Sequence, residues 1–118
     1  MSNEVDTRPW GSYEVLLNSK DCKVKRIVVQ PNQRLSYQYH HHREEFWTVV
    51  KGQAVVTLDG KQMTLNQRQQ VHIPFKAKHR IANKIEEPLI FIEIQMGTYF
   101  GEDDIIRIED DYNRLENE

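Results

Sequence analysis

The sequence predicts an all-β domain, folded as a small antiparallel barrel or a sandwich. Short runs rich in β-branched and aromatic residues recur along the chain at spacings near ten residues, with turn-forming residues between them. No stretch before Gly97 has the 3.6-residue periodicity of an amphipathic helix. The dipeptide Asp59-Gly60 joins two of the runs and is typical of a tight β-hairpin.

Eight runs are expected to be strands. The first ends at the turn signal Pro31-Asn32 and the third ends at Gly52. The last is β-branched and aromatic, and it is long enough to cross a barrel from edge to edge. In chain order the runs cover residues 22–30, 34–40, 45–52, 53–58, 61–65, 70–74, 79–83 and 88–97. The tail "EDDIIRIEDDYNRLE" is expected to form a short helix or an arm across the barrel.

Length and composition favour one soluble domain. A chain of 118 residues can bury a core without disulfides or a metal, and it shows neither a repeat nor a low-complexity linker. No apolar run approaches the roughly 20 residues of a membrane span, and the N-terminus lacks the apolar region of a signal peptide. Cys22 is alone, which excludes an intrachain disulfide framework. We therefore expect a cytoplasmic protein with no membrane partner.

The net charge of −2 is unevenly distributed. From Glu102 onward eight acids face two arginines, whereas the preceding part holds fourteen Lys/Arg and ten acids. This acidic tail argues against a nucleic-acid partner, and the mildly basic body suits one small phosphate better than a polyanion. A solvated surface with an acidic end explains the same charges.

Three consecutive histidines are the most unusual local feature. Successive side chains of a strand point to opposite faces, so Gln38, His40 and His42 share one face and His41 lies on the other. If the strand ends near His42, that residue lies on a turn instead. With Glu45 three residues further on, an imidazole, carboxylate and amide set suits a divalent ion of intermediate softness. A polar strand end exposed to solvent explains the same residues, and local spacing leaves both interpretations open.

Together with the second half of the chain, this segment resembles the two conserved motifs of the cupin superfamily. Those motifs read G-x₅-H-x-H-x₄-E-x₆-G and G-x₅-P-x-G-x₂-H-x₃-N. The matching positions are Gln38-x-His40-x₄-Glu45-x₆-Gly52 and Pro74-x₄-His79-x₃-Asn83. The resemblance implies one divalent metal ion held by Gln38, His40, Glu45 and His79, and leaves His41 and His42 outside the ligand set. Zn²⁺ is the first expectation, with Mn²⁺, Co²⁺, Ni²⁺, Fe²⁺ or Mg²⁺ as alternatives.

The chain departs from the cupin motifs at four positions. Gln38 stands where the first histidine is usual, which disfavours an Fe²⁺ oxygenase. Asn32, Arg68 and Lys76 replace three glycines. Asparagine tolerates the left-handed conformation, so Asn32 is a mild change, whereas Lys76 places a cation near the barrel mouth and could disturb the loop before His79.

The flanking segments narrow the resemblance to one family. They are similar to the cupin domain of type II mannose-6-phosphate isomerases, which usually forms the C-terminal part of bifunctional mannose-1-phosphate guanylyltransferase/mannose-6-phosphate isomerase enzymes. No segment resembles a Gly-rich phosphate loop, so we expect an isomerase cupin without the guanylyltransferase domain. The similarity runs from Arg8 to Arg114, through "RPWGSYE", "KVKRI", "LSYQYHHHREEFW", "PFKAKHRIAN" and "IEIQMGTYFGEDDIIRIEDDYNR".

This resemblance implies a single cupin domain over residues 1–118, a double-stranded β-helix or jelly-roll barrel with a short C-terminal arm or helix. We expect an N-terminal covering strand or arm over 1–21, the barrel over 22–97 and an acidic arm over 98–118. Cupins often pair through edge strands, so a homodimer is expected.

The family's reaction interconverts mannose 6-phosphate and fructose 6-phosphate through an enediol. It needs a base for a carbon-bound proton, an electrophile for the enediolate and a cation for the phosphate. The resemblance implies that a metal ion is the electrophile. The alternative is a non-catalytic, metal-containing cupin that binds a sugar or a sugar phosphate, since cupins host many functions.

Two residues are predicted to be catalytic. Glu93 lies on an inward face of an apolar strand, where burial would raise its pKa and suit a proton shuttle, although it could instead pair with Lys25 or Arg80. Arg114 matches the terminal arginine of the family's "DDYGR" ending, which the resemblance links to isomerase activity; Asn113 replaces the glycine. For substrate binding we expect Lys25, Arg80, Gln95 and Arg43, although each charge is more often on the surface.

Overall fold

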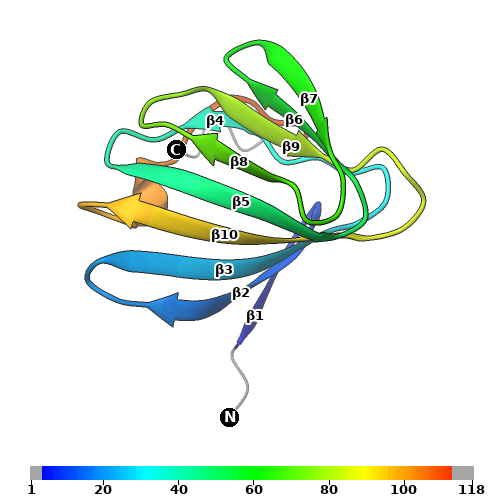
Figure 1. Cartoon of the computed structure of the whole chain (residues 1–118). Coiled ribbons are helices and arrows are strands. Elements are labelled where there is room, and N and C mark those ends of the chain that lie inside the picture. The colour runs from blue at the N-terminus through cyan, green and yellow to red at the C-terminus, as the bar shows by residue number, and fades with distance from the viewer. Residues whose placement is uncertain (1–3, 113–118) are drawn as a thin grey trace.

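The computed structural model describes residues 4–112, and over that part of the chain the protein is two antiparallel β-sheets that enclose a common interior (Figure 1). One sheet has the strand order β1-β2-β3-β10-β5-β8, and the other has the order β11-β4-β9-β6-β7. The all-β prediction is confirmed. The strands are β1 (Val5–Arg8), β2 (Gly11–Asn18), β3 (Cys22–Val29), β4 (Tyr37–Tyr39), β5 (Arg43–Lys51), β6 (Ala54–Leu58), β7 (Lys61–Leu65), β8 (Gln70–Ile73), β9 (His79–Ala82), β10 (Leu89–Gly97) and β11 (Ile106–Glu109).

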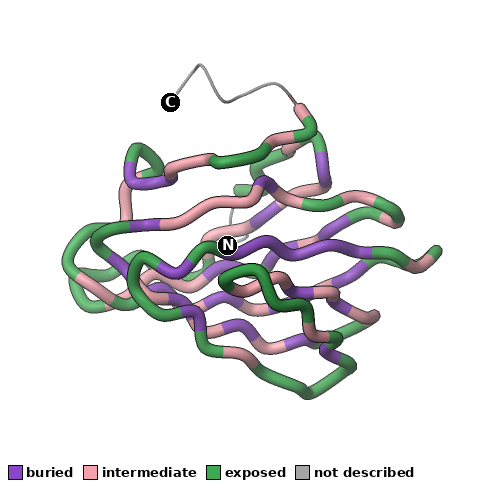
Figure 2. Tube along the Cα trace, turned by 90° about the horizontal axis from the view of Figure 1, so that it is seen from above, coloured by how far each residue is buried: buried purple, intermediate pink, exposed green. Residues whose placement is uncertain are grey.

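Strands β5 and β10 show why the sequence forms this interior. Burial alternates along both of them, as a pleated strand requires when one face is covered (Figure 2). They pair with each other, so that Glu93 lies opposite Trp47 and Gln95 lies opposite Glu45. The inward face of each strand therefore changes from apolar at one end to polar at the other.

The apolar end forms the hydrophobic core. Phe91 and Leu89 are fully buried, and the ring of Phe91 lies 5.5 Å from that of Trp47. Burying each large side chain contributes about 1.5–3 kcal/mol of hydrophobic free energy. This packing stabilises the strands whose other ends carry the polar residues.

Three turns adopt left-handed backbone where the cupin pattern has glycine. The φ angles are 61° at Asn32, 74° at Arg68 and 64° at Lys76, so the chain keeps the conformation without keeping glycine. Lys76 does not disturb the loop before β9, because its N–H donates to the carbonyl of His40 at 2.9 Å. The predicted Asp59-Gly60 hairpin joins β6 to β7, with φ of 48° and 85°.

Both ends of the described chain join the sheets. The hairpin of β1 and β2 extends the first sheet through pairing of β2 with β3. The C-terminal segment contains a single 3₁₀ turn, η1 (Glu102–Asp104), followed by β11, which pairs with β4. The expected choice between a helix and an arm is thus resolved as a short turn followed by a strand.

Candidate metal centre

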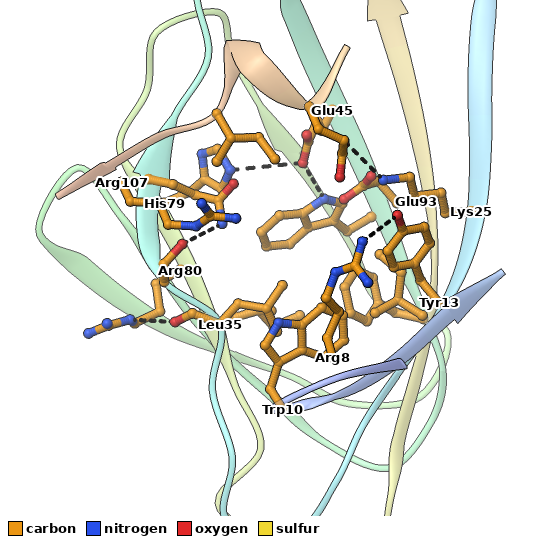
Figure 3. Close-up of a pocket in the computed structure, with 18 of the residues that line it drawn as sticks. Arg8, Trp10, Tyr13, Lys25, Leu35, Glu45, His79, Arg80, Glu93 and Arg107 are labelled. Carbon is orange, nitrogen blue, oxygen red and sulfur yellow. Dashed lines mark hydrogen bonds and ion pairs between the residues drawn. The ribbon is translucent and has the colours of Figure 1, made fainter. Parts of the chain in front are cut away.

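A cavity lies between the two sheets at their polar end (Figure 3). Trp47, Ile81 and Phe91 line its apolar part, where the hydrophobic core begins. Trp10, Ile27, Leu35 and Ile105 also line it, and its polar lining comes from β1, β2, β3, β4, β5, β9, β10 and the segment after Gly97. The predicted site residues Lys25, Gln38, Arg43, Glu45, His79, Arg80 and Glu93 all line it.

His40, Glu45 and His79 converge in this region. Each offers a ligand atom, and these atoms lie within 4.8 Å of one another. Nε2 of His40 is 3.2 Å from one carboxylate oxygen of Glu45, and Nε2 of His79 is 3.9 Å from the other. All three residues are at least 97% buried, so the sequence-predicted residues meet in a place that water reaches poorly.

The two histidines are held in the same orientation. Nδ1 of His40 faces the carbonyl oxygen of Asp104 at 3.1 Å, and Nδ1 of His79 faces that of Ala77 at 2.9 Å. A carbonyl only accepts, so each neutral ring carries its hydrogen on Nδ1 and presents the lone pair of Nε2 to the site. Histidine ligands of metals in proteins are commonly oriented in this way.

Glu45 is kept ionised at the centre of the cluster. Its burial would raise the pKa, but the guanidinium of Arg43 beside it holds the pKa well below its usual value. Oε2 accepts from Nε of Arg43 at 2.9 Å, and Oε1 accepts from the indole N–H of Trp47 at 3.0 Å. Burial lowers the pKa of His79 to about 4, so its ring is neutral at physiological pH. An anionic carboxylate with two imidazole lone pairs fits a divalent ion such as Zn²⁺.

Gln38 lies next to this cluster as the fourth predicted ligand. It is paired with His79 across β4 and β9 and is half-buried. Its amide N–H donates to the hydroxyl of Ser36 at 2.8 Å, which distinguishes the two ends of the amide. Its role as a ligand stays a prediction.

His41 and His42 lie outside the cluster. Both are exposed, and they follow the end of β4, as expected for a strand that ends before the turn. Their backbone N–H groups donate to the two carboxylate oxygens of Asp104, at 3.1 and 2.9 Å. Although burial opposes it, these bonds hold the pKa of Asp104 below its usual value. Sequence reasoning missed Asp104, which fixes both the turn and the His40 ring.

Glu93 lies on the wall of the cavity with an unusual protonation equilibrium. Burial, and then the negative charge of Glu45, raise its pKa to about 7, although Lys25 and Arg43 oppose the shift. The amide of Gln95 donates to Glu93 at 2.6 Å. The prediction that burial raises this pKa is confirmed. The catalytic role of Glu93 and the substrate-binding role of Gln95 stay predictions.

The predicted phosphate-binding cations are placed differently from one another. Lys25 is buried and lies across from Glu93 in the pairing of β3 with β10. Arg80 points away from the centre of the cavity, because its guanidinium donates to the carbonyl of Leu35 at 2.8 Å and to Glu109 at 3.2 Å (Figure 3). Arg114 lies outside the described residues.

Around Lys25, the cavity also holds Arg8 and Glu102, for which no binding role was predicted. Arg8 donates to the hydroxyl of Tyr13 at 3.1 Å, and Nζ of Lys25 lies 4.2 Å from the centre of the Tyr13 ring (Figure 3). Lys25 also pairs with the half-exposed Glu102 of η1 at 3.6 Å. Arg8 and Glu102 come from the two ends of the chain. The signal for Arg8 was its place in the "RPWG" segment that begins the family resemblance.

The chain is similar in sequence to a known protein family over most of its length. Residues 2–110 match the family model described as mannose-6-phosphate isomerase C-terminal. The alginate biosynthesis protein AlgA of Pseudomonas aeruginosa is 50% identical over 107 residues, which are 91% of this chain and 22% of that protein. A mannose-1-phosphate guanylyltransferase of Klebsiella pneumoniae is 46% identical over 91% of this chain and 23% of its own length. The chain thus spans less than a quarter of the curated relatives it matches.

Solved structures confirm the cupin fold. The capsular polysaccharide assembling protein CapF of Staphylococcus aureus superposes with a TM-score of 0.83 at 18% identity, over 92% of this chain and 33% of that one. An RmlC-like cupin of Shewanella frigidimarina gives a TM-score of 0.73 at 19% identity, over 86% and 87% of the two chains. At these identities the likeness concerns the fold alone. In residues 4–112, no helix has the length and apolar character needed to cross a membrane.

Proposed function

The chain belongs to the family of mannose-6-phosphate isomerase C-terminal domains, and from this premise we propose that it is a metal-dependent aldose–ketose isomerase. The proposed reaction interconverts mannose 6-phosphate and fructose 6-phosphate through an enediol. The observation that carries the proposal is the convergence of His40, Glu45 and His79 beside a cavity that Glu45 and His79 line together with Glu93, whose pKa is raised to about 7.

The proposed metal ligands are Nε2 of His40, the carboxylate of Glu45 and Nε2 of His79, with the amide of Gln38 completing the set. A divalent ion bound there would act as a Lewis acid toward the sugar oxygens at C1 and C2. Zn²⁺ fits the donors best, because imidazole and carboxylate are its usual ligands. Burial of the donors excludes competing water and so strengthens their interaction with an ion.

Glu93 is the proposed proton carrier. The reaction removes a proton from C2 and returns one to C1, so one group has to accept and then donate. A carboxyl group with a pKa of about 7 is present in both forms at neutral pH, which is the condition under which acid–base catalysis is most efficient. Gln95, hydrogen-bonded to Glu93, would orient the carboxylate.

Lys25 is the proposed contact for the substrate phosphate, together with Arg8. Both line the cavity, and Lys25 is buried and forms an ion pair at 3.6 Å with the half-exposed Glu102. A phosphate dianion would compete well for such a lysine, because exposed ion pairs contribute little stability. Arg114 is proposed as a catalytic residue on the basis of the family resemblance alone.

A coupled assay for fructose 6-phosphate tests the proposal, with mannose 6-phosphate as substrate and with and without a chelator. We expect turnover that the chelator abolishes and that one of Zn²⁺, Co²⁺, Mn²⁺ or Mg²⁺ restores. His79→Ala should remove both metal binding and turnover, and the exposed His41→Ala is the matched control that keeps both. No turnover with any of these ions, while mannose 6-phosphate still binds, would favour the alternative of a non-catalytic sugar-phosphate-binding cupin.

A further inference from the structure

Arg43 is a buried cation inside the candidate metal centre. Its side chain is 3% exposed, and it contacts two of the three side chains that would hold the ion. Nε donates to Oε2 of Glu45 at 2.9 Å, and Nη2 lies 3.3 Å from Nε2 of His40. These are the atoms that the proposed metal site requires.

His40 cannot bind Arg43 and a metal ion through Nε2 at the same time. Its Nδ1 faces the carbonyl of Asp104, so in the neutral ring Nε2 carries one lone pair. In that tautomer Nε2 accepts from Nη2 of Arg43 at 3.3 Å, beside Oε2 of Glu45 at 3.2 Å, and a metal ion would need the same lone pair. A divalent ion on Glu45 would also lie beside the positive guanidinium, and this repulsion is strong where water is excluded.

The guanidinium of Arg43 does not use all of its hydrogen-bond donors in its present position. Among the described residues, Nη1 of Arg43 has no hydrogen-bond partner although it is buried. Oε1 of the Gln95 carboxamide is also buried and, in this part of the chain, accepts no hydrogen bond. Gln95 lies directly opposite Glu45 in the pairing of β10 with β5, so both atoms belong to the same inward face. An unmade buried hydrogen bond is costly, and a turn of Arg43 toward Gln95 would remove this cost for both groups.

We propose that Arg43 and a divalent metal ion are alternative occupants of the His40–Glu45 pair. Without the ion, Arg43 neutralises Glu45 and occupies the lone pair of His40, which keeps the buried site intact. When the ion binds, Arg43 turns toward Gln95 and leaves both ligands. Arg43 thereby weakens the affinity for metal below what the donor set alone would give. This inference rests on the metal site of the proposed function.

The experiment measures Zn²⁺ affinity by competition with a chromophoric chelator, using protein stripped of metal. Arg43→Gln keeps a polar side chain and removes the competing charge, so we expect Zn²⁺ to bind at least about ten-fold more tightly than to the wild type. Arg26→Gln on β3 is the matched control, because Arg26 is exposed and lies outside the cavity. Its affinity for Zn²⁺ should equal that of the wild type.

If Arg43 supported metal binding instead of competing with it, Arg43→Gln would change the Zn²⁺ affinity in the opposite direction. If Arg43 only orients Glu45 for the metal, its loss should weaken binding by about ten- to a hundred-fold, as for other outer-shell partners. A weaker or unchanged affinity in Arg43→Gln therefore overturns the inference. That result would not contradict the proposed metal site, because the wild type still binds Zn²⁺.

A second variant covers the case in which Arg43→Gln does not fold. Arg43→Lys keeps the charge but loses the planar fork that reaches Glu45 and His40 together, so we expect Zn²⁺ affinity between those of the wild type and Arg43→Gln. The rise in Tm on adding Zn²⁺ should increase from the wild type through Arg43→Lys to Arg43→Gln, since the coupling between the Arg43 side chain and the metal ion is reciprocal. If neither the wild type nor either variant binds Zn²⁺, the metal site and this inference both fail.

Discussion

Replacement of Glu93 by glutamine should change how stability depends on pH. The substitution keeps the shape of the side chain and an oxygen that can accept from Gln95, but it removes the titrating group. Glu93 has a pKa of about 7 in the folded protein against an ordinary value of 4.5. The folded state therefore holds this proton over a range of pH in which the unfolded chain has released it.

The sign and size of the effect follow from linkage. Because the folded pKa is raised, the stabilising contribution of the proton is complete below the unfolded value and is lost as the pH rises through the folded value. With pKa values of 4.5 and about 7, the unfolding free energy of the wild type should fall by about 2.5 kcal/mol between pH 5 and pH 8 on account of Glu93. Glu93→Gln lacks this loss.

Urea denaturation of metal-stripped protein measures the effect at pH 5, 6, 7 and 8. The unfolding free energy of Glu93→Gln minus that of the wild type should increase by about 2.5 kcal/mol over this range. Glu87→Gln is the matched control, since Glu87 is exposed, and its profile should parallel the wild type. Parallel profiles for Glu93→Gln would show that the burial argument is wrong. In the isomerase assay the same variant should lose about 10²- to 10⁴-fold in turnover while keeping its affinity for metal.

Two further predictions concern backbone and turn geometry. Arg68→Gly and Lys76→Gly should each raise the unfolding free energy by about 0.5–1 kcal/mol in urea denaturation, because glycine relieves the left-handed conformation at some entropic cost; a loss of stability would contradict this. Asp104→Asn should lower Zn²⁺ affinity by about ten-fold, because the turn that orients His40 loses a charge-assisted acceptor. Asp21→Asn, at an exposed position, should leave the Zn²⁺ affinity unchanged. Equal affinities of the Asp104→Asn and Asp21→Asn variants would show that Asp104 does not influence metal binding.

The strands and the histidine cluster were predictable because both depend on short-range pattern. Alternation along β5 and β10 determines which of their side chains face inward, and alternation along the segment from Ser36 to His42 separated His41 from His40. The resemblance to the cupin motif from Gln38 to Gly52 then placed His40 and Glu45 in one site. His79 came from the resemblance, since no local rule joins positions 39 residues apart.

The surroundings of the cluster could not be predicted because they depend on long-range packing. Asp104 reaches His40 from 64 residues away through a one-turn 3₁₀ segment that has no strong pattern. Arg80 follows a candidate ligand directly and lines the cavity, but its guanidinium donates to the carbonyl of Leu35 and to Glu109, which lies 29 positions away. The substrate-binding role of Arg80 and the expected homodimer stay predictions.

The charge of the cavity favours an anionic ligand over a neutral sugar. Five cationic side chains line it, namely Arg8, Lys25, Arg43, Arg80 and Arg107, against the three carboxylates of Glu45, Glu93 and Glu102. At pH 7 one of these, Glu93, is only partly ionised, so the positive excess is larger than the count of five against three indicates. The whole chain has a net charge of −2, so positive charge is concentrated at the cavity. A divalent ion would increase the positive excess further, and a phosphate group, with about −1.5 to −2 charge at pH 7, would offset much of it.

Mannose 6-phosphate should therefore bind the metal-loaded protein measurably in calorimetry and lose affinity as salt is added, whereas mannose at the same concentrations should not bind. Equal binding of the two sugars would refute this electrostatic argument.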